Sequence, residues 1–268
     1  MVSAMLTAET MHAEGARYTA SIVCVPGLWS GAAVWRGFAG HLGHRGWECH
    51  LLDVCGVAGG VAARATAVAD YVAALPTPAV LVGHDAGGLI ALIAAHRTAP
   101  AAVVLVAPLV PGSRAARGLV LGARSLLALI TGGSVPPPTG RARAAWLDLP
   151  EPVPAELSRA LAPDDAGVVR DVVWGRVRPV PAGGVPVLLL AGGRDALLPP
   201  AEARLLAGTV AAEVHVLESA GHWPFAGPSW QDAVALVHRW LVQRLGEPLL
   251  ELYAETMAER DTGEDETE

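Results

Sequence analysis

The chain has 268 residues, of which 52% are hydrophobic, so it is long enough for one large α/β domain with a sizeable core. Its net charge of −7 comes mostly from residues 247–268, which hold nine acidic residues and one Arg, and the remainder is close to neutral. This distribution leaves no basic stripe for nucleic acid, and no apolar run is long enough to span a membrane. The three cysteines have neither disulfide nor zinc spacing, and no signal peptide is recognised. We therefore expect a cytoplasmic protein with no metal or other cofactor.

The first half of the chain alternates short apolar runs with stretches in which apolar residues recur at helix spacing. Residues 1–17 are small and polar, and we expect an irregular lead-in there. After it, in chain order, the pattern predicts a strand at 19–25, a helix at 33–44, a strand at 48–52, a helix at 62–75, a strand at 79–82, a helix at 87–97 and a strand at 102–107. Strands that alternate with helices in this way indicate a mainly parallel sheet with helices on both faces.

The alternation stops between residues 109 and 183, where no clear strand is visible. Helical patches are expected at 114–130, 141–148 and 155–161, and a Pro-rich segment covers 135–139. We interpret residues 109–183 as a helical cap inserted into a core domain, which then consists of residues 1–108 and 184–246. The cap holds nine Arg against six acidic residues, and a solvated helical surface is favoured over an anion-attracting lid as the explanation.

The alternation resumes with a strand at 186–191, a helix at 200–208, a strand at 213–217 and a closing helix at 230–245. Residues 247–268 are expected to form an acidic, largely disordered tail. The predicted fold class is therefore α/β, a mainly parallel sheet flanked by helices, with one inserted helical cap.

Asp85 stands at the junction between the strand at 79–82 and the helix at 87–97. The surrounding residues 83–88 read Gly-His-Asp-Ala-Gly-Gly, and the small residues let the backbone turn sharply. Such a turn pushes the Asp85 side chain out at the top of the sheet and at a helix N-terminus, where an anion is favoured. We expect an ionised carboxylate that faces a pocket. On its own such an Asp would more often be a helix N-cap, and it is the partners further along the chain that favour a catalytic role.

Asp195 and His222 also follow predicted strands, at 186–191 and 213–217. Ligands bind beyond the carboxyl ends of the strands in parallel sheets, so Asp85, Asp195 and His222 are expected to meet at one edge. Each of the last two alone would be read as an ordinary loop residue. The three in this order, each at a strand end, predict a nucleophile, an acid and a histidine base.

This order is that of the α/β-hydrolase family, which the chain resembles over residues 18–245. The matching motifs are Gly-His-Asp-Ala-Gly-Gly at 83–88, Gly-Gly-Arg-Asp-Ala-Leu-Leu-Pro at 192–199 and Gly-His-Trp-Pro at 221–224. The resemblance implies an oxyanion hole made by the backbone N–H groups of Leu28 and Ala86. It also implies that His84 is a packing residue.

An Asp at the elbow resembles the epoxide hydrolases and haloalkane dehalogenases of this family. A carboxylate attacks a saturated carbon and leaves an alkyl ester on Asp85, and His222, oriented by Asp195, then activates water to hydrolyse that ester. Attack on an ordinary ester would give an anhydride, so esterase and lipase activity are disfavoured. The resemblance therefore implies an enzyme, an epoxide hydrolase, that acts on a small organic molecule without a cofactor.

The cap and the elbow depart from both resemblances. Epoxide hydrolases usually carry two Tyr in the cap to protonate the opening oxygen, whereas all three Tyr of this chain lie outside residues 109–183. We expect the indole N–H groups of Trp146 and Trp174 to donate instead, the alternative being that both residues fill the cap core. Dehalogenases commonly cradle halide with a Trp directly after the nucleophile plus an Asn or a second Trp. This chain has Ala86 there and no Asn, so dehalogenation is the weaker alternative.

The segment Pro-Gly-Leu-Trp at 26–29 resembles another branch of the family, the plant-type esterases and hydroxynitrile lyases, whose elbow carries Ser. We assign Trp29 to the substrate pocket. The mixture suggests a specialised enzyme of natural-product biosynthesis, and it keeps open a lyase or cyclase in which Asp85 and His222 act only as acid and base. A ligand-binding receptor is a further alternative, although such receptors often lose a member of the triad and here all three positions are filled. Substrate identity and oligomeric state stay open.

Overall fold

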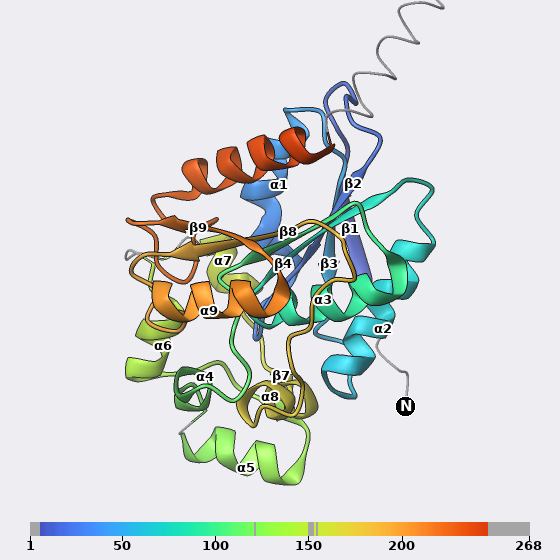
Figure 1. Ribbon diagram of the computed structural model, residues 1–268. Coiled ribbons are helices and arrows are strands. Elements are labelled where there is room, and N and C mark those ends of the chain that lie inside the picture. The colour runs from blue at the N-terminus through green and yellow to red at the C-terminus, as the bar shows by residue number, and fades with distance from the viewer. Residues whose placement is uncertain (1–5, 121, 150–152, 154, 246–268) are drawn as a thin grey trace, which may run out of the picture.

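A seven-stranded sheet forms the centre of the computed structural model, which describes residues 6–120, 122–149, 153 and 155–245 (Figure 1). Its strands are β1 (Thr7–Met11), β2 (Ser21–Val25), β3 (Cys49–Asp53), β4 (Ala79–His84), β5 (Ala102–Val106), β8 (Val187–Gly192) and β9 (Glu213–Leu217). They lie in the order β1-β3-β2-β4-β5-β8-β9. The β1–β3 pair is antiparallel and the other pairs are parallel.

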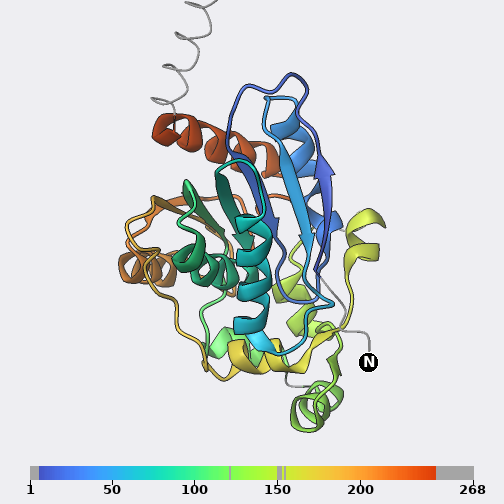
Figure 2. The same cartoon turned by 90° about the vertical axis from the view of Figure 1, so that its right-hand side faces the viewer.

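Helices cover both faces of this sheet. They are α1 (Arg36–Gly43), which follows the 3-10 turn η1 (Ala32–Trp35), then α2 (Gly60–Ala73), α3 (Ala86–Thr98), α9 (Pro200–Val210) and a last helix at 230–245. Figures 1 and 2 show α2, α3 and α9 on one face of the sheet and α1 on the other. None of the described helices is both long enough and apolar enough to cross a membrane.

The central strands are buried along their whole length. Every residue of β2, β4, β5 and β8 is buried, which is why each reads in the sequence as a continuous apolar run and not as an alternation. Outside residues 1–17 and 109–183, each predicted strand and helix is present, with ends within two residues of those predicted. The predicted α/β-hydrolase architecture is therefore confirmed.

Strand β1 lies within residues 1–17, where we expected an irregular lead-in, and for the residues described that expectation is wrong. β1 pairs with β3 from Thr7 opposite Asp53 to Met11 opposite Cys49. Its side chains are exposed or half-buried, so backbone hydrogen bonds to β3 hold most of it, helped by Met11, which packs against the core. A strand signal in a sequence depends on a buried face, and a polar edge strand lacks one.

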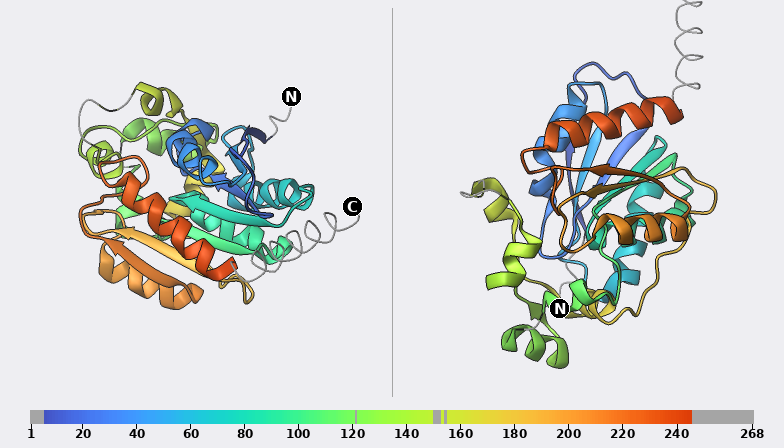
Figure 3. Two further views of the ribbon diagram at one scale, coloured as in Figure 1. Left: turned by 90° about the horizontal axis from the view of Figure 1, so that it is seen from above. Right: turned by 60° about the vertical axis from the view of Figure 1, so that its left-hand side comes forward.

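Residues 109–183, called the insert below, lie between β5 and β8, which are neighbours in the sheet. The elements of the insert are α4 (Arg114–Gly118), α5 (Ala123–Thr131), β6 (Ser134–Val135), α6 (Gly140–Trp146), α7 (Ala155–Ala160), β7 (Asp164–Asp165) and α8 (Ala166–Val173). The insert is thus mainly helical. Most of it lies beyond one end of the sheet in Figure 1 and in the right-hand view of Figure 3.

Some elements of the insert differ from the sequence pattern. The patch at 114–130 forms two helices, α4 and α5, and the two-residue strands β6 and β7 pair with each other outside the main sheet. Helix α8 was not anticipated. It begins after Asp165, whose side chain accepts a hydrogen bond from the N–H of Val168 at 3.1 Å, and this cap explains where the helix starts.

The two ends of the insert close on each other. The N–H of Gly112 donates to the carbonyl of Val172 at 2.7 Å. A Cβ on Gly112 would lie 3.1 Å from the Cα of Gly175, and both glycines have positive φ, 71° and 65°. Glycine is needed at both positions because the outgoing and returning chains approach too closely for side chains.

Candidate active site

Asp85 lies in the tight turn between β4 and α3. Its φ of 54° and ψ of −125° form a strained conformation that residues other than Gly rarely adopt. Glycines make the turn possible, because a Cβ on Gly83 would overlap the backbone of Gly87 and a Cβ on Gly87 would overlap that of Val25. Asp85 Oδ1 accepts a hydrogen bond from the N–H of Ala86, so the side chain also caps α3.

Asp85, His222 and Asp195 meet at the carboxyl ends of the parallel strands. His222 Nδ1 lies 2.9 Å from Asp195 Oδ2, and His222 Nε2 lies 3.4 Å from Asp85 Oδ2. Asp195 Oδ1 accepts the backbone N–H groups of Leu197 at 2.7 Å and Leu198 at 3.1 Å, which fix its orientation. The structure therefore brings together the three residues that the sequence singled out, in the geometry of a catalytic triad.

The two carboxylates control the charge of His222. Burial alone lowers the pKa of this imidazole, but Asp195 and Asp85 on either side outweigh burial and raise the pKa to about 10. Burial raises the pKa of Asp195, and it is outweighed by His222 and the two backbone donors, which hold that pKa below its usual value. His222 is thus an imidazolium at neutral pH, which distinguishes this site from a triad with a neutral Ser nucleophile.

Trp146, at the end of α6 in the insert, covers the Asp85 carboxylate. Its Nε1 donates to Asp85 Oδ2 at 3.1 Å, and its ring packs edge-on against Trp29 and Trp223 with centroids 5.5 and 5.4 Å apart. Trp223 Nε1 donates in turn to the carbonyl of Trp146 at 2.6 Å. Asp85 and His222 have no exposed surface. The expectation of a carboxylate open to a pocket is therefore not met, because Trp146 occupies the place in front of it.

Asp148, two residues further along, is a contact that the sequence did not reveal. Its Oδ2 accepts the backbone N–H of His222 at 2.7 Å, and burial raises its pKa. A Cβ on Gly221 would overlap this carboxylate, so the glycine of the Gly-His-Trp-Pro motif leaves room for it. In the sequence, Gly221 alone indicated that another group approaches the backbone before His222, and it could not identify that group as Asp148.

The loop after β2 is tied to the insert through a buried ion pair. Asp164 Oδ2 accepts the backbone N–H of Trp29 at 2.9 Å, and Asp164 also pairs with Arg64, whose side chain is as deeply buried. Trp29 has a positive φ of 55° and donates its Nε1 to the carbonyl of Val135 at 3.0 Å. Trp29 therefore anchors the loop, and its ring reaches the site through Trp146.

The segments expected to supply the two backbone donors of an oxyanion hole, at Ala86 and before Leu28, both lie against Asp85. The N–H of Ala86 already bonds to Asp85 Oδ1. Leu28 is fully buried, and the residue before it, Gly27, lies so close to Asp85 that a Cβ on Gly27 would overlap the side chain. The loop that carries Leu28 is thus in contact with the nucleophile position.

Trp174 and His84, two further residues singled out in the sequence, differ in burial. Trp174 is 48% exposed, with the guanidinium of Arg176 4.8 Å from its ring centroid, so the structure does not bring it to the site. His84 is fully buried, and its Nε2 lies 2.9 Å from the carbonyl of His222. Burial lowers the pKa of His84 to about 4, so it is neutral.

Among the described residues, no group of three or more His, Cys, Asp or Glu side chains is arranged to hold a metal ion.

A sequence model of the alpha/beta hydrolase family matches residues 22–237. The fold is similar to that of a monoacylglycerol lipase from Paleococcus ferrophilus, with a TM-score of 0.67, 19% identity, and 89% of this chain and 99% of that chain covered. A lipase-esterase related protein from Clostridium acetobutylicum has a TM-score of 0.69 and 14% identity, with 88% of this chain and 99% of that chain covered. A methylesterase from Arabidopsis has a TM-score of 0.60 and 21% identity, with 82% of this chain and 98% of that chain covered. Such identities establish a shared fold only, and no curated protein matches by sequence. The chain belongs to the alpha/beta hydrolase family.

Proposed function

We propose that this protein is a hydrolase that opens an epoxide in a small organic substrate through an alkyl ester on Asp85. One observation carries the proposal: the elbow presents a carboxylate, with Oδ1 on the N–H of Ala86 and Oδ2 beside His222 and Trp146. An Asp cannot form the acyl-enzyme of an esterase, because its attack on an ester would give an anhydride. The lipase and esterase names of the structural neighbours therefore do not extend to this chain.

In the first step, Oδ2 attacks a ring carbon and the carbon–oxygen bond of the epoxide breaks. The leaving oxygen takes the proton of the His222 imidazolium and a hydrogen bond from Trp146 Nε1, since both groups already lie close to Oδ2. His222 leaves this step neutral, and Asp85 is a neutral ester. The raised pKa of His222 thus supplies the acid that a cap without Tyr would otherwise lack.

In the second step, neutral His222 takes a proton from water, which attacks Cγ of the Asp85 ester. The N–H of Ala86 stabilises the oxyanion that forms on Oδ1. Collapse of this intermediate releases the diol and restores the Asp85 carboxylate and the His222 imidazolium, so protons balance over the cycle. His222 can act as the base in this step because it gave its proton to the epoxide oxygen in the first.

A second candidate rests on the same imidazolium. Asp85 and a protonated His222 form a ready acid–base pair, which favours a lyase or cyclase of natural-product biosynthesis without any covalent intermediate. Dehalogenation has less support, because Ala86 offers no side-chain donor to a departing halide.

A single turnover of an aryl epoxide such as styrene oxide in oxygen-18 water tests the covalent route. We expect oxygen-18 in the Asp85 peptide after one turnover of the wild type. In His222→Gln the second step is blocked and the first keeps only the Trp146 donor, so a peptide heavier by the mass of the epoxide should form slowly and persist. Asp85→Asn should show neither. Diol formed without oxygen-18 in Asp85 would exclude the proposal.

A further inference from the structure

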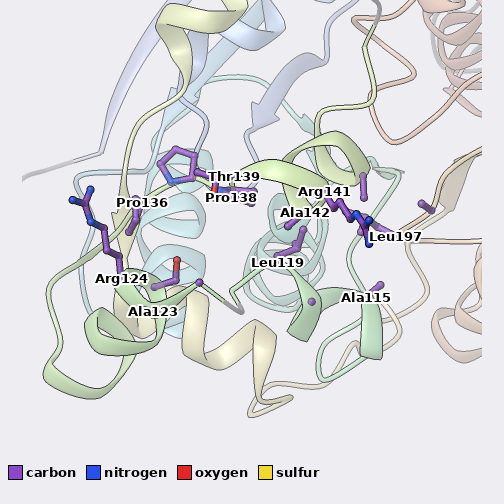
Figure 4. Close-up of a pocket in the computed structure, with 16 residues that line it drawn as sticks. Ala115, Leu119, Ala123, Arg124, Pro136, Pro138, Thr139, Arg141, Ala142 and Leu197 are labelled. Carbon is purple, nitrogen blue, oxygen red and sulfur yellow. The ribbon is translucent and has the colours of Figure 1, made fainter.

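The insert lines a half-open cavity of about 780 Å³ that the catalytic residues do not line. Its volume falls within the range of small-molecule pockets. The wall is formed by α4, α5, α6, the Pro-rich segment at 136–138, and Ala196 with Leu197 from the loop after β8 (Figure 4). The cavity thus lies where the insert meets the core.

The wall is apolar and positively charged at its edges. Small and apolar side chains such as Leu119, Ala142 and Leu197 make up most of it, and the charged residues are Arg124 and Arg141. In Figure 4 these two arginines lie at opposite ends of the lining side chains, Arg124 near Pro136 and Arg141 near Leu197. None of the described residues that line the cavity is a carboxylate.

The sequence around the cavity has the same bias. From Ala86 to Leu147 the chain contains no Asp or Glu, although it is otherwise acidic overall. Five arginines fall between residues 113 and 147, at 114, 117, 124, 141 and 143. With no acidic partner in this stretch to neutralise them, these guanidinium groups create a positive field around the cavity.

The cavity shares two segments with the triad. Ala145 lines the cavity, and the next residue, Trp146, donates to Asp85. Leu197 also lines it, and its backbone N–H donates to Asp195. A molecule in the cavity is therefore close to the catalytic groups along both segments.

We propose that this cavity binds the substrate, and that the substrate is an amphipathic organic anion, an apolar chain or ring that carries a carboxylate, sulfonate or phosphate. The apolar part leaves water against Leu119 and the prolines, and the anionic group pairs with the planar guanidinium group at one end of the cavity, that of Arg124 or that of Arg141. The identity of this ligand as substrate rests on the proposed function, whereas the binding site and its preference for anions do not.

Calorimetric titration with dodecanoate and with dodecyltrimethylammonium, below micelle concentrations, tests the anion class. We expect dodecanoate to bind and its cationic counterpart not to. Arg124→Gln with Arg141→Gln should weaken dodecanoate binding about tenfold or more, and the matching double change to Lys should retain most of it. Arg204→Gln, at an exposed arginine of α9 that does not line the cavity, is the matched control and should have no effect.

The location is tested by filling the cavity. Leu119→Trp, and separately Ala142→Phe, should abolish dodecanoate binding while circular dichroism stays native, and Ile130→Ser on the exposed side of α5 should leave it unchanged. Equal binding of both surfactants would overturn the anion class, and binding unaffected by both filling variants would overturn the site. Asp85→Asn should bind dodecanoate normally, because Asp85 does not line the cavity. A wild-type protein that binds dodecanoate but opens no epoxide would refute the proposed function without refuting this binding site. If 10,11-epoxyundecanoate is hydrolysed no faster than its neutral amide, the ligand of this cavity is not the substrate.

Discussion

The sheet and the insert differ in the interactions that hold each in place. Strands β4 and β5 are buried on both faces, whereas the insert exposes Leu127 to 62% and Ile130 to 76%. Helix α8 of the insert packs its buried valines into the core, and Trp146, Asp148 and Asp164 add buried hydrogen bonds and an ion pair. The site therefore lies between a region fixed by apolar burial and one in which polar contacts add to apolar burial, and substitutions separate these contributions.

The largest effect is expected on the sheet side of this boundary. Asp85→Asn keeps the size of the side chain but removes the nucleophile, so turnover of an epoxide should fall on the order of 10⁴-fold. Asp70→Asn, on the exposed face of α2, is the matched control and should keep full activity. The measurement is kcat/KM with circular dichroism as a check of folding. Retained turnover in Asp85→Asn would mean that the carboxylate is not the attacking group.

On the insert side, the largest loss of stability is expected at Asp164. Asp164→Ala leaves Arg64 buried without its partner and frees the Trp29 N–H, which should cost about 3–5 kcal/mol of unfolding free energy. Its neighbour Asp165 only caps α8, and Asp165→Ala should cost about 1 kcal/mol. Urea unfolding of both variants gives the comparison. Equal losses would show that the ion pair does not hold the insert in place.

The stability of the folded protein should depend on pH through the charge of His222. Because its pKa rises from an ordinary value of about 6.5 to about 10 on folding, its stabilising effect is complete below pH 6.5 and is lost as the pH rises towards 10. Unfolding free energy should fall by about 2 kcal/mol between pH 7 and 9 in the wild type. In His222→Gln this pH-dependent loss should be absent, and an identical slope in both proteins would contradict the raised pKa.

The smallest effects separate the two tryptophans of the insert. Trp146→Phe removes a hydrogen bond to Asp85 and a donor to the leaving oxygen, so kcat/KM should fall about tenfold. Trp174→Phe changes an exposed ring and should alter kcat/KM less than about twofold. The measurement is kcat/KM of Trp146→Phe and of Trp174→Phe on the same epoxide, each compared with the wild type. A larger loss in Trp174→Phe would mean that the insert binds substrate in another arrangement.

The core and the triad could be predicted because both follow from burial. A strand buried on both faces, such as β8, is a continuous apolar run, and the polar residue directly after it stands at the edge of the sheet. Asp85 directly follows β4, and Asp195 and His222 lie in the short loops that follow β8 and β9. Strand β1 gave no such signal because it has no buried face.

The contacts of the insert could not be predicted in the same way. Arg64 and Asp164 are 100 positions apart, and nothing in either local sequence identifies the other as its partner. Trp146 and Trp174 were equivalent in the sequence, because the direction in which each ring points depends on how short helices dock. Asp148 depends on the same docking. Such choices are made by tertiary contacts between residues distant in the chain.

The close approach of Gly112 and Gly175 makes the insert an exchangeable unit. The chain leaves the core and returns to it at almost the same point, so a substitute segment of any length needs only to begin and end there. Recombination at these two positions would keep β5, β8 and the elbow intact while replacing Trp146, Asp148 and both arginines of the cavity together. A single recombination event can therefore replace the residues that contact the substrate and retain the nucleophile Asp85.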